Sequence, residues 1–354
     1  MHVVVVGGGT GGHVIPAIPV MEALRREGHD VSFIGTTSGY EERLLVHTDV
    51  RYYGISSGKL RRYFSFENLR DVFRVLTGIV QAFFLLGRLK PEVIFSKGGF
   101  VAFPVVLAGW LRRVPVIGHE SDITPGLANR LSLPFMQTLC ISFPETRVRR
   151  YKGRVVHTGS PLRPEFLAGD PERGRERFAL PADRPILIVV GGSQGARVLN
   201  AVVRDAVVPL TKRYEVIHVC GPGNVVTIEQ PGYHAYEFIR EGWADLIAAA
   251  KIVVSRAGAN SLFEVLALQK LNLLVPLSAA ASRGDQIENA NYAEARGFSL
   301  VIREEALRVE TMMEGLINLE RQAEAYRECL TSFARTDAVG ALCSEIHRLV
   351  DARA

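Results

Sequence analysis

Two glycine-rich stretches, about half the chain apart, contain the residue types that bind phosphate. The first, at 7–13, reads GGGTGGH after a run of four valines, and the second, at 191–197, reads GGSQGAR after the apolar run 186–190. Glycine lets backbone N–H groups approach a ligand closely, and a helix that begins after the turn favours an anion at its N-terminus. Because each stretch opens its own predicted α/β domain, we expect a cleft between twin domains that holds a phosphorylated substrate.

The spacing Gly7-x-Gly9-x-x-Gly12 also fits a dinucleotide-binding loop. Such a loop needs an acidic residue at the end of the second strand to hold the adenosine ribose. The predicted second strand ends FIGTT at 33–37 without a carboxylate, and Asp30 lies at its start, on the wrong edge of the sheet. The sequence therefore disfavours a nicotinamide or flavin enzyme. A glycine turn that only packs a helix on a strand remains an alternative.

A second set of polar residues follows the predicted strand 252–254. The stretch 255–264 (SRAGANSLFE) opens a helix with small residues whose amides could face a diphosphate. Glu264 lies about one turn further along, where its carboxylate could accept hydrogen bonds from both ribose hydroxyls, or where it is simply a solvated helix residue. The polar loop 282–289 has side chains suited to sugar hydroxyls, although an ordinary loop has the same composition.

The segments between these motifs predict two doubly wound parallel α/β domains, since strands and helices alternate in both halves. We expect the strands at 3–6, 31–34, 93–95, 114–117, 139–141 and 155–157, and then at 186–190, 215–219, 235–238, 252–254, 273–275 and 300–301. The main helices of the first half are expected at 15–26, 67–89 and 103–111. The alternation breaks near 159–164. We therefore expect domains at 1–163 and 164–337, with the helix of 338–354 packing back on the first.

Composition agrees with an ordinary two-domain folded protein, because the 354 residues are 47% apolar and 22% charged. The four cysteines lie far apart without a CxxC pair, so neither a disulfide framework nor a zinc site is expected, and a reducing cytosol fits best. Met1 and His2 lead directly into the first predicted strand, which leaves no room for a signal peptide. The net charge of +5 is modest, and we expect no nucleic-acid partner.

Taken together, the motifs resemble the MurG family of UDP-N-acetylglucosamine transferases. They occur in the order of that family over almost the whole chain: GGGTGGH at 7–13, KGGF at 97–100, HESDITPGLAN at 119–129, GSPLR at 159–163, GGSQGAR at 191–197, and SRAGA at 255–259 through Glu264. The resemblance implies a GT-B glycosyltransferase that converts lipid I to lipid II in peptidoglycan synthesis. It also implies that the acceptor binds the N-terminal domain and the nucleotide sugar mainly the C-terminal one.

The resemblance further implies roles for single residues. The residues implied for the donor UDP-GlcNAc are Thr10, Gly11, Gly12, Arg163, Ser193, Gln194, Ile239, Gly258, Ala259, Asn260, Glu264 and Gln286. Within this set, Ser193 would contact the diphosphate, Glu264 the ribose and Gln286 the sugar hydroxyls, and the backbone near Ile239 would contact the uracil. The residues implied for the acceptor diphosphate are Gly9, Lys97, Gly98 and Gly99. Asp122 stands where many members have asparagine, so no donor contact is assigned to it.

The implied transfer inverts the anomeric centre and needs a base for the 4-hydroxyl of the muramoyl sugar. His13 and Glu120, at the ends of predicted strands, are the candidate catalytic bases. A histidine that merely caps or packs the first helix is the alternative for His13. Because the sequence contains no Asp-x-Asp motif, we expect no metal and no other cofactor. Helix dipoles, loop amides and Arg163 would stabilise the departing UDP.

A lipid-linked acceptor requires contact with a membrane. The apolar stretch 72–89 is broken by Arg74, Gln81 and Arg88, which makes it a poor candidate for spanning a bilayer. One helical face gathers Val72, Phe73, Leu76, Ile79, Val80, Phe83 and Phe84, with Trp110 and Leu111 nearby and Lys59, Arg61, Arg62, Arg112 and Arg113 flanking them. Such a patch suits an anionic leaflet, so we expect a peripheral protein on the cytoplasmic side of the cell membrane. The alternative is that this face is the core side of the helix.

Two rival functions stay open. Another UDP-sugar enzyme of the same fold, such as a UDP-GlcNAc 2-epimerase, is disfavoured by the flanked apolar face and by the KGGF loop, since a soluble epimerase has no lipid to hold. A non-catalytic nucleotide-binding clamp would keep the region around Glu264 but would tolerate the loss of His13 and Glu120.

Overall fold

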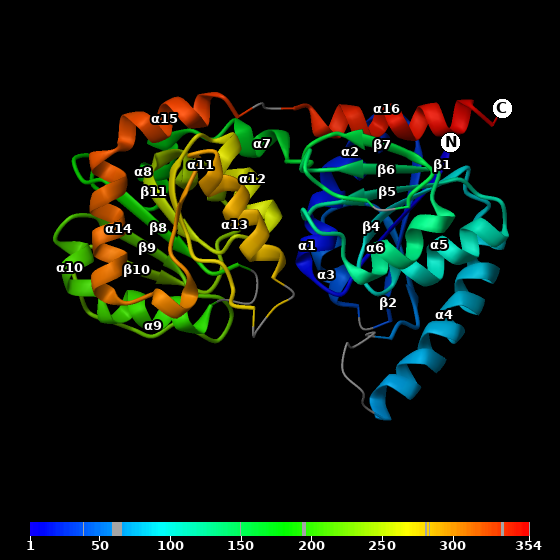
Figure 1. The fold of residues 1–354 in the computed structure, drawn as a ribbon, viewed down its shortest axis with the longest axis horizontal. Coiled ribbons are helices and arrows are strands. Elements are labelled where there is room, and N and C mark those ends of the chain that lie inside the picture. The colour runs from blue at the N-terminus through cyan, green and yellow to red at the C-terminus, as the bar shows by residue number, and fades with distance from the viewer. Residues whose placement is uncertain are drawn as a thin grey trace. The chain divides into compact units, whose positions relative to one another are not determined.

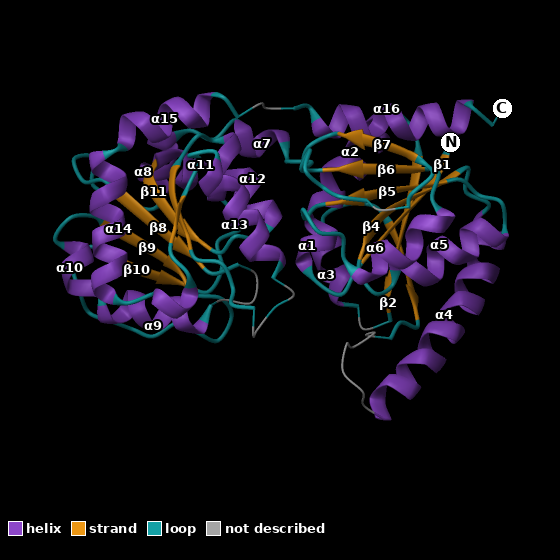
Figure 2. Cartoon of the chain, viewed as in Figure 1, coloured by secondary structure: helices purple, strands orange, loops and turns teal. Residues whose placement is uncertain are grey.

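The computed structural model describes residues 1–37, 39–58, 66–148, 150–192, 196–279, 282, 284–333 and 336–353. By packing, the chain divides into two units, Met1–Arg163 with Thr336–Ala354, and Pro164–Arg335. Each unit is a parallel β-sheet with helices on both faces (Figure 1, Figure 2). The predicted fold class is therefore confirmed.

The sheet of the first unit, sheet A, has the strand order β3-β2-β1-β4-β5-β6-β7. Its strands are β1 (His2–Gly7), β2 (Asp30–Thr36), β3 (Arg51–Ile55), β4 (Val93–Gly98), β5 (Val116–Glu120), β6 (Thr138–Ile141) and β7 (Arg154–His157). Its helices are α1 (Gly11–Val14), α2 (Ile18–Arg26), α3 (Tyr40–Leu45), α4 (Phe66–Leu89), α5 (Ala102–Leu111), α6 (Leu127–Ser132) and α16 (Ala338–Asp351), with 3₁₀ turns at Ile15–Ala17 and Leu133–Phe135.

Two apolar clusters cover the faces of sheet A. Alternate side chains of a buried strand point to opposite faces, so Val3 and Val5 pack with α2 and α16, while Val4 and Val6 pack with α4 and α5. The return of the chain through α16 therefore completes one of these two faces.

The sheet of the second unit, sheet B, has the order β10-β9-β8-β11-β12-β13. Its strands are β8 (Ile186–Val190), β9 (Glu215–Val219), β10 (Tyr233–Tyr236), β11 (Ala250–Ser255), β12 (Leu271–Leu274) and β13 (Leu300–Val301). Its helices are α7 (Pro164–Leu167), α8 (Pro171–Arg177), α9 (Arg197–Asp205), α10 (Val207–Thr211), α11 (Trp243–Ala249), α12 (Ala259–Ala267), α13 (Asp285–Ala295), α14 (Val309–Arg321) and α15 (Ala323–Thr331), with a 3₁₀ turn at Glu304–Ala306.

Every predicted strand is present, but several begin or end two or three residues from the predicted bounds, among them the interior strands β4, β5 and β12, and one edge strand was missed. Strand β3 was not predicted because its sequence, RYYGI, contains no apolar run and its residues are only partly buried. The edge strand β10 begins at Tyr233, two residues before the predicted start at Ala235. Edge strands bury one side less than central strands, so the apolar pattern that marks them is weaker.

Each sheet has one switch point, where the strand order reverses. It lies between β1 and β4 in sheet A and between β8 and β11 in sheet B. In open α/β sheets, ligands bind outside the carboxyl ends of the strands at that point. Each glycine-rich stretch directly follows a strand that borders a switch point.

Candidate functional site

At the switch point of sheet A, the first glycine loop and the KGGF loop begin side by side. Gly7, the last residue of β1, pairs with Gly98 at the end of β4. Two consecutive residues with left-handed backbone, Gly98 (φ +94°) and Gly99 (φ +88°), then turn the chain. The two stretches that the sequence assigned to the acceptor therefore lie next to each other.

These loops are crowded by the protein itself. A Cβ atom added to Gly99 would lie 1.9 Å from the carbonyl oxygen of Gly8, and one added to Gly9 would lie 2.9 Å from the ring of Phe100. A Cβ on Gly98 would lie 2.9 Å from Oδ1 of Asn129. Internal packing is thus sufficient to require glycine at these positions.

Glu41, a residue that sequence analysis did not single out, holds the first glycine loop. Its side chain is almost completely buried, and its Oε1 accepts a hydrogen bond of 2.8 Å from the amide of Gly9. The hydroxyl of Thr36 donates to Oε2 at 2.7 Å, and the Tyr52 hydroxyl donates to it at 3.3 Å. Burial, and then the charge of Glu41, raise the pKa of Tyr52. The Gly9 amide therefore already has an internal carboxylate as its acceptor.

Lys97 is a buried cation beside these loops. Its ammonium donates to the hydroxyl of Ser121, and only 1% of the residue is exposed. Burial lowers the pKa of Lys97 to about 8, although the carboxylates of Glu120 and Asp122 oppose this shift. A cation with so little hydration interacts strongly with a neighbouring anion.

Glu120, the last residue of β5, organises the loop that follows it. Its carboxylate accepts hydrogen bonds from the amide of Asp122 (3.0 Å), the amide of Gly126 (3.1 Å) and Nδ2 of Asn129 (2.7 Å). Only 4% of Glu120 is exposed. This carboxylate therefore has a structural task, which sets it apart from the other candidate base.

His119 and His13 occupy different surroundings. His119 is buried and its Nε2 donates to the carbonyl oxygen of Gly159 at 3.0 Å, while burial and the charge of Lys97 hold its pKa well below the usual value. His13 lies on α1 and is partly exposed, and its amide donates to the carbonyl of Thr10 at 3.2 Å. Of the two predicted bases, His13 and Glu120, only His13 is substantially accessible to solvent.

Glycines also mark the switch point of sheet B, but there they face open space. Gly192 (φ +87°) follows β8 and Gly258 follows β11. A Cβ added to either would meet no atom within 4 Å among the residues that the structure describes. Ser193 and Gln194, predicted donor contacts, lie outside these residues.

Two buried side chains, Arg256 and Asn289, hold the loop between β11 and α12 in place. Arg256 donates to the carbonyl of Val275 at 3.1 Å and forms an ion pair with Glu304. Burial is the largest single influence and opposes ionisation of Glu304, but the hydrogen bond and charge of Arg256 together with the hydrogen bonds from Ser278 outweigh it, so that the pKa of Glu304 is lowered. Asn289 of α13 donates to the carbonyl of Ala257 at 3.1 Å. These contacts position the amides that begin α12.

The other predicted donor residues lie on the helices and loops at this edge. Ala259 and Asn260 form the first turn of α12, directly after Gly258, and Glu264 lies further along on the same helix, partly buried. Gln286 is the second residue of α13, and its Oε1 accepts from the amide of Leu277 at 3.0 Å, which orients its amide nitrogen. The structure thus brings these residues to one edge of sheet B.

Five predicted positions lie elsewhere. Ile239, after β10, is 9% exposed and packs in the core of the second unit, so only its backbone could meet a base. Arg163 is exposed at the end of the first segment of unit 1. Thr10, Gly11 and Gly12 begin α1, and of these only Gly12 is exposed.

Helix α4 carries an exposed apolar face. Its exposed residues are Val72, Phe73, Leu76, Val80 and Phe84, and Trp110 and Leu111 of α5 are also exposed. Ile79 and Phe83 are partly buried, so the alternative that this whole face is core is wrong. Arg112 packs over the ring of Phe83 at 4.2 Å, and Arg113 is exposed. Lys59, Arg61 and Arg62 lie outside the described residues.

By length and composition, the segment Arg70–Leu89 is the one described helical stretch that could cross a membrane, with a mean hydropathy of 1.6. Its opposite face belongs to the core of the first unit, where Ala82 and Leu86 are buried. A Cβ on Gly78 would lie 2.1 Å from the carbonyl oxygen of Ser56, which shows how closely this face packs. The helix is therefore built into the fold along one side.

Both halves of the chain match known protein families. The model of the glycosyltransferase family 28 N-terminal domain matches residues 3–141, and that of the glycosyltransferase family 28 C-terminal domain matches residues 186–339. The UDP-N-acetylglucosamine–N-acetylmuramyl-(pentapeptide) pyrophosphoryl-undecaprenol N-acetylglucosamine transferase of Clostridium perfringens is 46% identical over 328 residues, which cover 92% of this chain and 91% of that protein. The protein of the same name from Legionella pneumophila is 45% identical over 327 residues, with coverages of 91% and 90%.

Two solved structures are similar to this chain in fold. The crystal structure of MurG from Acinetobacter baumannii matches with a TM-score of 0.75 and 26% identity, over 98% of this chain and 99% of that one. The UDP-GlcNAc 2-epimerase of Neisseria meningitidis, crystallised with UDP-GlcNAc, matches with a TM-score of 0.66 over 99% and 100% of the two chains, but with 14% identity. The latter similarity concerns the fold alone.

Proposed function

This chain belongs to glycosyltransferase family 28, and we infer that it is the N-acetylglucosaminyltransferase acting on the lipid-linked N-acetylmuramyl-pentapeptide. It is a UDP-GlcNAc-dependent enzyme of peptidoglycan synthesis that moves N-acetylglucosamine to the MurNAc unit of lipid I and so forms lipid II. The identity of 45–46% with relatives of this name over nine tenths of both chains supports this function more strongly than fold similarity does.

The observation that carries the donor site is the open space around Gly192 and Gly258 at the switch point of sheet B. Gly258 has φ −65° and ψ 139°, a backbone conformation that any residue adopts, and the described fold leaves room for a side chain. A ligand that approaches the backbone closely is then the remaining reason for glycine. The UDP diphosphate would lie against these amides, at the N-terminus of the nine-residue helix α12.

The donor contacts follow from this position. Glu264 would accept hydrogen bonds from the ribose hydroxyls, and the amide nitrogen of Gln286 would donate to a sugar hydroxyl. Ser193 and Gln194 would complete the diphosphate site, and the backbone at Ile239 would contact the uracil. Asn260, with Gly258 and Ala259, would form the turn that faces the phosphates.

The acceptor diphosphate would be bound near the switch point of sheet A. The ammonium of Lys97 supplies the charge, and the backbone of Gly98 and Gly99 supplies a surface without side chains. Because the amide of Gly9 donates to Glu41, that residue would shape the loop rather than donate to the ligand. Thr10, Gly11 and Gly12, the next residues of the loop, would contact the donor.

For the chemical step, His13 is the better of the two candidate bases. The carboxylate of Glu120 accepts three hydrogen bonds from its own loop and would keep that loop in place. His13 would remove the proton of the muramoyl 4-hydroxyl while the oxygen attacks the anomeric carbon and UDP departs with the bonding electrons. The amides at α12 and the cation of Arg163 would stabilise the charge that develops on UDP.

The exposed apolar face of α4 would be the membrane contact, and the protein would be peripheral on the cytoplasmic side. Arg74 is exposed on α4 and Arg113 is exposed two residues after the end of α5, and each basic residue near an anionic surface contributes about 1 kcal/mol. Lys59, Arg61 and Arg62, which precede α4 in the sequence, would add to this attraction.

A transfer assay tests the activity. Radiolabelled UDP-GlcNAc is incubated with a lipid I analogue, with UDP-glucose and a reaction without acceptor as controls. Label is expected in the lipid product only with UDP-GlcNAc and acceptor together. Release of free sugar or of an epimer without acceptor would support an epimerase, and binding without any turnover would support a clamp.

Liposome flotation tests the membrane contact. The wild type is expected to float with vesicles that contain anionic lipid, and the double variant Phe73→Ser, Phe84→Ser is expected to stay in solution. The control is Val208→Ser, which changes an exposed apolar residue of the second unit. Equal, negligible binding of wild type and variant to anionic and neutral vesicles would contradict this assignment.

A further inference from the structure

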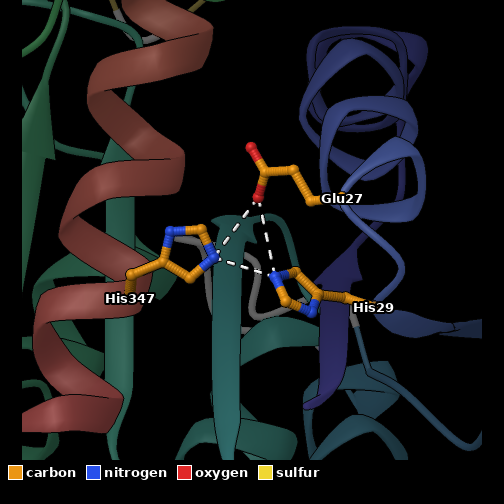
Figure 3. A group of neighbouring side chains, drawn as sticks. All are labelled: Glu27, His29 and His347. Carbon is orange, nitrogen blue, oxygen red and sulfur yellow. Dashed lines mark hydrogen bonds and ion pairs between the residues drawn. The ribbon is translucent and has the colours of Figure 1, made fainter.

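Two histidines and a glutamate from two distant segments of the chain meet at the amino-terminal edge of sheet A. Glu27 directly follows α2, His29 directly precedes β2, and His347 lies on α16. Figure 3 shows the three side chains pointing toward one another, with α16 on one side and the turn between α2 and β2 on the other. Residues more than 300 positions apart in the sequence thus form one cluster.

The distances within this cluster fit metal coordination. The two Nε2 atoms of His29 and His347 are 2.9 Å apart, and Oε2 of Glu27 lies 3.3 Å from Nε2 of His347 and 3.6 Å from Nε2 of His29. Zinc bonds of about 2.0–2.1 Å in a tetrahedron place neighbouring ligand atoms about 3.3–3.4 Å apart. The three atoms therefore already outline one face of a tetrahedron and need to move only a few tenths of an ångström.

The chemical states of the groups also fit. The two imidazoles face each other through Nε2, so both can offer a lone pair toward the centre of the cluster. The neutral imidazole is the form that binds metals. When both Nε2 atoms bind the metal, each ring carries its hydrogen on Nδ1, so the Met1 amino group, 3.5 Å from Nδ1 of His29, would have to move away, and the carboxylate supplies negative charge.

The cluster is partly exposed to solvent, and the helix that carries His347 is anchored in the core. The exposed fractions of the side chains are 20% for His29, 35% for His347 and 45% for Glu27. One side of the cluster thus faces solvent, where a water molecule can complete the coordination. On the other side α16 is anchored, because Leu342 and Ile346 are fully buried in the core of the first unit.

We propose that Glu27, His29 and His347 bind one divalent transition-metal ion, best fitted by Zn²⁺, and that the ion fastens α16 to the turn between α2 and β2. The cysteine spacing predicted no zinc site, and this site uses no cysteine. It is a structural site, since β2 begins here while the substrate loops follow the carboxyl ends of the strands. Transfer activity is therefore expected to be the same with and without the ion.

The test is metal binding by the full chain without a tag at either end. The protein is stripped with a chelator and titrated with Zn²⁺ against a chromophoric competitor, and Co²⁺ serves as a spectroscopic probe. We expect one Zn²⁺ per chain, visible Co²⁺ bands typical of four-coordination, and a melting temperature that rises with Zn²⁺. Loss of a partner that only orients a ligand costs about 10–100-fold in metal affinity, so His29→Ala and His347→Ala are expected to lose at least that much.

Two further variants make the result specific. His47→Ala removes an exposed histidine of the same unit and is expected to bind like the wild type. Glu27→Gln keeps the side-chain size, and it is expected to weaken binding while circular dichroism stays unchanged. Equal affinities for the wild type, His29→Ala and His347→Ala, or a full equivalent of Zn²⁺ on the double histidine variant, would overturn the proposal.

Discussion

The two switch points use glycine for different reasons. At sheet A, the places where side chains of Gly9, Gly98 and Gly99 would lie are already filled by the protein, whereas at sheet B the space around Gly192 and Gly258 is open among the described residues. In the first loop, the amide of Gly9 donates a hydrogen bond to the buried carboxylate of Glu41. At Gly192 and Gly258 no described atom would contact an added Cβ atom, which leaves room for a ligand next to the backbone.

This difference separates two meanings of one motif. A glycine-rich turn after a buried strand indicates a phosphate site only if the backbone is left accessible once the fold has formed. In the proposed sites, the charge for a phosphate would come from the buried ammonium of Lys97 in the first unit and from backbone amides at a helix N-terminus in the second. Substitutions of matched glycines should therefore damage folding in one unit and binding in the other.

The largest effect is expected for Gly99→Ala. Its Cβ would overlap the carbonyl of Gly8, and alanine would have to adopt φ +88°. Overpacking and a left-handed backbone each cost about 1–3 kcal/mol, so the free energy of unfolding should fall by about 2–6 kcal/mol in urea denaturation. Gly28→Ala is the control, because Gly28 has φ +84° but no atom within 4 Å of its added Cβ. If both variants lost the same stability, crowding at Gly99 would be excluded as the cause.

The second-largest effect is expected for Glu264→Gln in the second unit, which removes the charge proposed to bind the ribose. Hydrogen bonds to a charged group contribute about 1.5–3 kcal/mol, which corresponds to about 10–100-fold in affinity. We expect the KM for UDP-GlcNAc to rise by that factor while the KM for the acceptor stays constant. Glu294→Gln on α13 should behave like the wild type. If the KM for the acceptor rose instead, Glu264 would be assigned to the acceptor site and not to the donor site.

Gly258→Ala tests whether the open space at sheet B is used by a ligand. Because its backbone conformation suits alanine and no described atom lies near, the free energy of unfolding should change by less than about 1 kcal/mol. The added methyl group would hold the diphosphate away from the amides, and inhibition by UDP should weaken by about tenfold. Normal UDP inhibition by a folded Gly258→Ala protein would show that the open space does not hold the phosphates.

The smallest effect is a pH dependence at Lys97. With a folded pKa near 8 against 10.5 for a free lysine, the ammonium is present below pH 8 and lost above it. The unfolded chain binds more protons between these values, so the contribution of Lys97 to stability rises with pH there. The acceptor KM should increase roughly fourfold between pH 7 and 8.5, as the charged fraction falls.

Lys97→Met tests the origin of that dependence. The variant keeps much of the side-chain volume and removes the charge, so its acceptor KM should be high and constant over this pH range. Lys152→Arg, at an exposed lysine of the same unit, should retain the wild-type profile. A pH dependence that persists in Lys97→Met would assign it to another group.

The sequence predicted the central strands, the two doubly wound sheets and the motifs at their edges, because buried parallel strands are continuous apolar runs. It did not reveal Glu41, a single glutamate on a six-residue helix whose partners are Gly9, in the loop after β1, and Tyr52, on β3. Nor did it distinguish crowded glycines from open ones. Both positions are glycine in the sequence, and only the atoms that surround Gly99 and Gly258 in the folded protein differ.

The candidate bases illustrate the same limit. Spacing placed both His13 and Glu120 after strands, but the three hydrogen bonds that occupy Glu120 depend on how the loop to Asn129 folds. The cluster of Glu27, His29 and His347 could not be predicted at all, since one of its members lies on the last helix.

The position of α16 has a consequence for synthesis. Leu342 and Ile346 belong to the same apolar cluster as Val3 and Val5, so one face of sheet A stays uncovered until α16 has been synthesised. The inserted unit, Pro164–Arg335, has all of its strands available earlier and can fold first. The nascent first unit therefore exposes apolar surface for longer than the second, and a chain truncated before α16 should aggregate through its half-covered sheet.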